Sequence, residues 1–175
     1  MGAWAGPFLV AALLLTAAGA LKAVDPVTTA GALRKAGLPG APALVRAGGV
    51  VEVVIGVAAI ATGAPVAAAL VALSYALFTA FVVVALVRRL PIGSCGCFGK
   101  VDTPPSIVHV VLDLGFAGVA AAAAVAGEVA LPDVVADQPL AGIPFLLLLA
   151  IGCSLVFLAF TALPKTMAAV REVAA

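Results

Sequence analysis

The stretch PVAAALVALSYALFTAFVVVALV, residues 65–87, contains no charged residue and ends directly before Arg88 and Arg89. About 20 consecutive apolar residues are enough for a helix to cross the hydrocarbon core of a bilayer. Gly63 and Pro65 form a turn signal at its start, so the apolar run before it is expected to be an antiparallel neighbour. This stretch therefore predicts a membrane-spanning helix, and the remaining sequence extends the pattern.

The composition of the whole chain agrees with that prediction. Of its 175 residues, 65% are hydrophobic and only 10% are charged, and the mean hydropathy is +1.32. A soluble domain carries about a quarter charged residues, so this chain has too little polar surface to cover a water-facing globule. We expect an all-α, polytopic membrane helix bundle that forms one integral membrane domain over residues 1–175.

Five apolar runs are long enough to span the bilayer, and the first is expected to be retained rather than cleaved. A short segment at residues 26–36 is too short to span and is expected to lie at the interface. A Gly- and Pro-rich loop covers residues 90–105. The expected spans are residues 4–24, 43–62, 65–87, 106–126 and 141–163.

The basic residues lie on one side of this topology. That side holds the loop after the first span, the 90–105 loop and the C-terminal tail, whereas the other side carries Glu128, Asp133 and Asp137 and no base. The positive-inside rule then predicts a plasma-membrane protein with its N-terminus outside and its C-terminus and 90–105 loop in the cytoplasm. A net charge of +1 without a basic block gives no indication of nucleic-acid binding. The basic residues on the first side are Lys22, Arg34, Lys35, Arg46, Arg88, Arg89, Lys100, Lys165 and Arg171.

Two thiols separated by one glycine, Cys95 and Cys97, stand out in the 90–105 loop. A disulfide across so short a spacer is strained and readily reduced, and nearby bases would favour the thiolate. Thiolates also bind soft metals such as Cu(I), with His109 as a further ligand. Structural zinc is disfavoured because four ligands at zinc-like spacing are missing. The residues favour redox exchange, with a soft-metal site and an unreactive loop as equally weighted alternatives.

Lys22 and Glu52 are ionisable residues inside or at the ends of spans, where such groups default to a functional hypothesis. Lys22 suits an interfacial side chain whose ammonium reaches the headgroups. Glu52 suits a structural ion pair with Lys22 or Arg46, or a role in proton transfer and thiol tuning. The sequence leaves these interpretations open.

His109 and Asp113 lie four residues apart on the fourth span, so they share one helix face. They suit either a structural pair or a proton relay that tunes the thiols. Cys153 on the fifth span suits a small core residue, with a relay thiol as the alternative. Gly48, Gly49 and Gly56 suit internal packing or a dimer face equally well, so the oligomeric state is left open.

The run Cys95-Gly96-Cys97-Phe98-Gly99-Lys100, followed by a Pro/Ser turn and a span with Asp113, resembles the MauE family of methylamine-utilisation membrane proteins. The opening of the chain is similar to the wider DoxX-like superfamily. There a first span ends in Lys-x-x-Asp-Pro, here at residues 22–26, and a Leu-Pro step, here at residues 38–39, precedes a second span with Glu52. The resemblance covers residues 8–125 and implies a DoxX-like four-helix core plus a fifth transmembrane helix.

The resemblance implies a function in maturation of the disulfide-rich small subunit of methylamine dehydrogenase, beside a thioredoxin-like partner. Cys95 and Cys97 would then act in thiol-disulfide exchange, as in a thiol-disulfide oxidoreductase. A soft-metal (copper) binding or transport protein and a non-catalytic membrane scaffold for a redox enzyme are the alternatives. A quinone acceptor is a variant of the first reading, although the sequence shows no aromatic-rich pocket. The cytoplasmic loop predicted from charge conflicts with a partner outside the cell.

Overall fold

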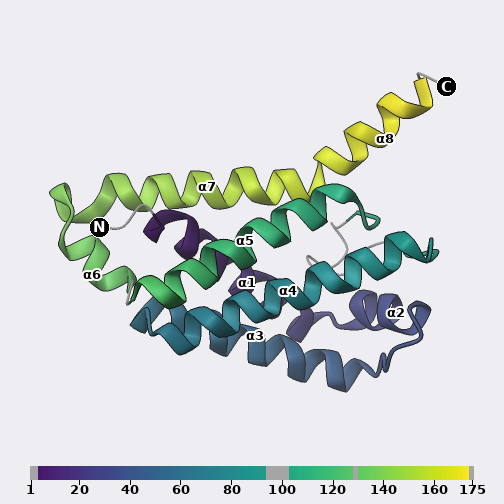
Figure 1. The fold of residues 1–175 in the computed structure, drawn as a ribbon, viewed down its shortest axis with the longest axis horizontal. Coiled ribbons are helices and arrows are strands. Elements are labelled where there is room, and N and C mark those ends of the chain that lie inside the picture. Colours follow the sequence, from purple (N-terminus) through teal and green to yellow (C-terminus); the bar gives the residue numbers. More distant parts are fainter. Residues whose placement is uncertain (1–3, 94–102, 128–129, 174–175) are drawn as a thin grey trace.

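The computed structural model describes residues 4–93, 103–127 and 130–173. In those ranges every regular element is helical, and five helices are long and apolar enough to cross a membrane. The expected all-α membrane bundle is therefore confirmed (Figure 1). Cys95 and Cys97, which carry the main sequence hypothesis, lie outside the described residues.

The helices follow the expected spans closely, with additional short elements after the fourth span. The short segment expected at 26–36 is the helix α2, and the region after the fourth span, which carries Asp133 and Asp137, contains α6 and one 3-10 turn, η2. The long helices are α1 Ala5–Val24, α3 Pro42–Thr62, α4 Pro65–Val87, α5 Ile107–Ala126 and α7 Ile143–Thr161; the others are α2 Val27–Lys35, α6 Leu131–Ala136, η2 Pro139–Gly142 and α8 Leu163–Val173.

The chain after α7 is helical, where the sequence predicted only a C-terminal tail. It continues as α8, which leaves the bundle at an angle (Figure 1). Pro164 stands in the first turn of α8 and has no backbone N–H, so α7 cannot pass through it as a regular helix. The last span therefore ends at Thr161 and the chain changes direction there.

Helix α1 lies at the centre of the bundle. Of its apolar stretch, 56% is buried between the other helices, against 11% for the last span. It packs most extensively on α3 and also contacts α4, α5 and α7. The core contains Phe8, Leu9, Leu15, Val71 and Phe160, together with many alanines.

Small residues allow α1 and α3 to approach closely. A Cβ built on Gly19 would lie 2.6 Å from the carbonyl oxygen of Gly49, and a Cβ on Gly56 would contact the Thr16 side chain. Without a strong hydrophobic force between helices in lipid, such backbone contact is a main source of packing energy. Gly49 and Gly56 thus serve internal packing, whereas a Cβ on Gly48 would meet nothing within 4 Å.

Candidate functional site

The close contact of α1 and α3 brings Lys22 and Glu52 together. Lys22 Nζ lies 2.8 Å from Glu52 Oε1 and 2.7 Å from Oε2, so the ammonium donates to both carboxylate oxygens. Lys22 is only 5% exposed. Arg46, the alternative partner, instead donates to the carbonyl of Ala23. The ion pair is present, and the view of Lys22 as a side chain that reaches the headgroups is wrong because its ammonium lies inside the bundle.

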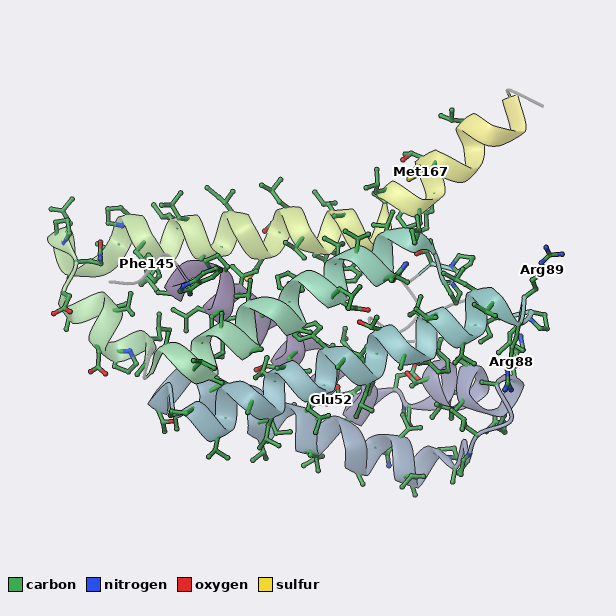
Figure 2. The ribbon with its side chains drawn as sticks, viewed as in Figure 1. Glu52, Arg88, Arg89, Phe145 and Met167 are labelled. Carbon is green, nitrogen blue, oxygen red and sulfur yellow. The ribbon has the colours of Figure 1, made fainter. Side chains whose placement is uncertain are left out.

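This ion pair forms the polar wall of a cavity of about 330 Å³. Lys22 comes from α1 and Glu52 from the middle of α3, and Figure 2 shows Glu52 in the region between α3 and α4. Helix α2 contributes Thr29, and the remaining lining is apolar or glycine. These further lining residues are Leu33, Leu38, Leu44, Val45, Gly48, Gly49, Leu77, Phe78 and Phe81.

Two phenylalanines of α4 line the cavity, which the sequence analysis did not foresee. Lys22 Nζ lies 4.1 Å from the centre of the Phe78 ring, a cation–π contact. Phe81 lines the same cavity one turn further along α4. The spacing of three residues puts both rings on one helix face, and this pattern in the sequence is the signal that could have identified an aromatic wall.

A second polar group lies at the start of α5. His109 is completely buried, and its Nδ1 lies 2.9 Å from Ser106 Oγ, while its Nε2 lies 3.5 Å from Thr103 Oγ1. Thr103, also completely buried, donates to the carbonyl of Phe160 at the end of α7. We call Thr103, Ser106, His109 and Phe160 the His109 cluster. It joins the segment before α5 to the last span.

Asp113 lies one turn after His109 on α5 and is 1% exposed. The two residues share the buried face, as the spacing of four predicted. Ser106 occupies the N-cap position, but its hydroxyl contacts the imidazole rather than capping a backbone N–H. The signal for this is the Ser-x-x-His spacing, which places the hydroxyl one turn before the ring.

Cys153 lies in the middle of α7, on a different helix from Lys22, Glu52 and His109. It is partly buried, and it packs against the hydrophobic core cluster as a free thiol. This environment suits the small core residue described above. Its alternative role as a relay thiol stays a prediction.

The segment that carries Cys95 and Cys97 is held at both of its described ends. Before it, Lys35 of α2 donates to the carbonyl of Pro91 at 2.9 Å, and Ile92 is buried against Ala32 of α2 and Ala85 of α4. After it, Thr103 belongs to the His109 cluster. Both attachment points lie at the end of the bundle where α2 is found (Figure 1). The cysteine segment therefore begins and ends on two different, packed parts of the fold.

The described residues do not form a set of metal ligands. Within residues 4–93, 103–127 and 130–173, no three His, Cys, Asp or Glu side chains gather closely enough to hold one ion. His109 has a hydroxyl oxygen near each ring nitrogen. A copper ion at His109 would have to replace one of these contacts.

Charge divides the described bundle into two ends. Figure 2 shows Arg88 and Arg89 at the end of α4, which is the end that also holds α2, and α8 begins there with Lys165. Asp133 and Asp137 belong to α6 and its cap at the opposite end. The separation seen in the linear sequence is thus kept in three dimensions.

Comparison with known proteins gives one finding. A family model described as methylamine utilisation protein MauE matches residues 1–126. The comparison with curated proteins found no match, and neither did the comparison with solved structures. The matched residues include α1 to α5, and hence the whole cavity with its Lys22–Glu52 pair and most of the His109 cluster. The chain is a member of the MauE family, whose model describes a methylamine utilisation protein, and it is a multi-pass helical membrane protein.

Proposed function

We propose that this protein carries out thiol-disulfide exchange through Cys95 and Cys97 in support of an exported partner protein. The observation that carries the proposal is the Cys-Gly-Cys spacing in a segment whose two flanks are attached to α2 and α7. Flanks attached in this way restrict where the thiol pair can reach. Membership of a methylamine-utilisation family supports the choice, since maturation of the disulfide-rich subunit of methylamine dehydrogenase is the function that this resemblance implies.

The exchange balances without a further reagent when the partner is a thioredoxin-like dithiol protein. A partner thiolate attacks one sulfur of a Cys95–Cys97 disulfide and forms a mixed disulfide. The second partner thiolate resolves it, so the partner gains a disulfide and Cys95 and Cys97 become thiols. Two electrons and two protons move from the partner to the pair, and the same steps in reverse reduce the partner.

His109 and Asp113 are proposed to tune this chemistry from the start of α5. Both are buried. His109 contacts Thr103, the first described residue after the segment that carries Cys95 and Cys97. Glu52 forms the ion pair with Lys22. Its proposed part in proton transfer concerns the cavity that this pair lines.

The orientation follows as a further part of the proposal. The described bases gather at the end with α2, and the positive-inside rule puts that end in the cytoplasm of the plasma membrane. Cys95 and Cys97 would then face the cytoplasm, so their direct exchange partner would be a cytoplasmic thioredoxin, and the exported protein would be served indirectly through a relay across the membrane. An impermeant maleimide applied to intact cells that express single-Cys variants tests this: a cytoplasmic pair is labelled only after the membrane is opened, and labelling of intact cells overturns the orientation.

Two alternatives from the sequence have no described contact in their favour. A copper-binding or transport protein would use Cys95, Cys97 and His109, and it would retain Cu(I) through purification. A non-catalytic scaffold for a redox enzyme would tolerate loss of both thiols. Copper analysis of the purified protein tests the first alternative, and the experiment below tests the second.

The test uses the purified full-length protein in detergent with a thioredoxin as the exchange probe. Thiol redox states are read from gel shifts after alkylation with a large maleimide. Cys95→Ser is expected to abolish exchange, and Cys97→Ser to abolish turnover and trap a mixed disulfide. Cys153→Ser is the matched control and is expected to keep exchange or weaken it only mildly. Exchange that survives in both Cys95→Ser and Cys97→Ser would contradict the proposal.

A further inference from the structure

The cavity around Lys22 and Glu52 has the features of a ligand site rather than of a packing defect. Its volume of about 330 Å³ is at the lower end of the range for small-molecule pockets. Lys22, Glu52 and Thr29 are its polar lining residues, and the rest is leucine, valine, phenylalanine and glycine. The hollow is open on one side, so a lipid-soluble molecule in the membrane can enter it and reach the buried ion pair.

The charges of the cavity select a neutral occupant. Lys22 and Glu52 neutralise each other, and a carboxylate or phosphate ligand would compete with Glu52 for the ammonium and leave a buried charge without compensation. An ammonium carries three N–H donors. Among the described residues, Lys22 donates two of them to Glu52, so the third can donate to an oxygen of a ligand. The site thus suits a neutral molecule with a carbonyl group.

The walls select a planar, lipid-soluble occupant. Phe78 and Phe81 offer aromatic surface beside the ammonium, and aromatic rings pack well on such surface. Leu38, Leu44 and Leu77 are 49%, 56% and 61% exposed and border the same cavity. In a membrane, exposed apolar side chains face lipid, so the ligand enters from the hydrocarbon phase.

Helix α2 connects the cavity with the cysteine segment. Thr29 and Leu33 line the cavity, while Ala32 and Lys35 of the same helix contact Ile92 and Pro91 just before that segment. One short helix therefore contacts both the ligand site and the chain that leads to the thiols. An occupant that moved α2 would move the attachment of the cysteine segment.

We propose that the cavity binds a neutral lipid-soluble quinone, which accepts the two electrons released by Cys95 and Cys97. This inference rests on the proposed thiol-disulfide exchange and names its electron acceptor. Two thiols and one quinone become one Cys95–Cys97 disulfide and one hydroquinone, so two electrons and two protons pass to the ring oxygens. Lys22 would hydrogen-bond a ring carbonyl, and the Lys22–Glu52 pair would pass a proton to it.

The test measures binding and electron transfer separately, with ubiquinone bearing a single isoprenoid unit as the probe. Gly48→Leu adds a side chain at the cavity wall without a backbone clash, because nothing lies within 4 Å of a Cβ there. Gly115→Leu is the matched control, since Gly115 is equally open on α5 and does not line the cavity. Binding to the full-length protein in detergent is measured by equilibrium dialysis. We expect Gly48→Leu to weaken binding at least about tenfold, and Gly115→Leu to leave it unchanged.

Electron transfer is followed as loss of quinone absorbance after anaerobic mixing with the reduced protein. Cys95→Ser is expected to bind the quinone as the unmodified chain does and to fail to reduce it. Absence of binding, binding that Gly48→Leu leaves unchanged, or a bound quinone that the dithiol protein does not reduce would each overturn the inference. Exchange with thioredoxin that continues in these cases leaves the proposed function standing, whereas exchange that survives Cys95→Ser and Cys97→Ser removes that function whether or not quinone binds.

Discussion

The two buried polar groups of this bundle differ in charge and in access. Lys22 and Glu52 form a charged pair at the wall of a cavity, next to apolar side chains that face lipid. The His109 cluster contains hydroxyls, an imidazole and a backbone carbonyl, with His109 and Thr103 completely buried. The two groups therefore suit different roles. The charged pair, which lines a cavity, suits binding of a ligand, whereas the fully buried cluster joins two parts of the chain beside the cysteine segment.

The largest effect is expected from separating the charged pair. Lys22→Met or Glu52→Gln leaves one buried charge alone and should lower the free energy of unfolding by about 3–5 kcal/mol. The double variant removes both charges and should recover most of that loss. Thermal unfolding in detergent measures all three. A double variant whose loss equals the sum of the single losses would show that Lys22 and Glu52 contribute independently, and would contradict a stabilising ion pair.

The same double variant tests whether the charged pair binds a ligand or serves packing alone. It keeps the shape of the cavity but loses the ammonium that would donate to a carbonyl oxygen, so quinone binding should weaken while folding is retained. Equilibrium dialysis with the short-chain ubiquinone measures this. Equal binding by the folded double variant would assign Lys22 and Glu52 to packing alone.

A smaller effect is expected for the His109 cluster. His109→Ala leaves the buried Thr103 and the Ser106 hydroxyl without the imidazole and should cost about 2–3 kcal/mol of stability. Because Thr103 follows the cysteine segment, exchange with thioredoxin should slow as well. His109→Asn keeps hydrogen-bonding capacity and should restore part of both. If His109→Ala changed exchange but not unfolding, the cluster would act on the thiols and not on the fold.

The glycines of α3 provide the next test. A Cβ at position 49 would lie 2.6 Å from the Gly19 carbonyl oxygen, so Gly49→Ala should destabilise the bundle by about 1–2 kcal/mol through overpacking. Gly48→Ala is the matched neighbour and should be neutral or slightly stabilising, since alanine favours helix. Unfolding midpoints in detergent compare the two. Equal destabilisation would indicate that position 48 is also packed, for example in a dimer.

The smallest effect is expected at the link between α2 and the cysteine segment. Lys35→Met removes an exposed hydrogen bond to the Pro91 carbonyl, which should cost at most about 1 kcal/mol. The rate of thioredoxin exchange should nevertheless change, because the attachment before Cys95 and Cys97 is loosened. Lys165→Met is the control, an exposed lysine at the same end of the bundle. Identical rates in both variants would remove α2 from the exchange mechanism.

Much of the candidate site could be anticipated from residue spacing, and the rest depended on contacts between distant segments. The shared face of His109 and Asp113 follows from helical periodicity, and the pairing of Lys22 with Glu52 was one of two options for Glu52. The cavity was not anticipated, because Phe78 and Phe81 meet Lys22 only when α4 packs beside α1 and α3. The hydrogen bond from Thr103 to Phe160 joins residues that are 57 positions apart, and no local sequence pattern predicts it. The cysteine pair remains a sequence prediction.

Residue order alone gave the class of the molecule, since apolar runs of about 20 residues are stable in a bilayer only as helices with all backbone groups hydrogen-bonded. It also determined the family, the uneven charge of the two sides and the position of the thiols. Three features emerged only from the packing of the helices: Lys22 turns inward, Gly49 packs while Gly48 stays open, and a cavity forms that α2 helps to line. These outcomes depend on which helix faces meet, and side-chain periodicity specifies a face without naming its partner.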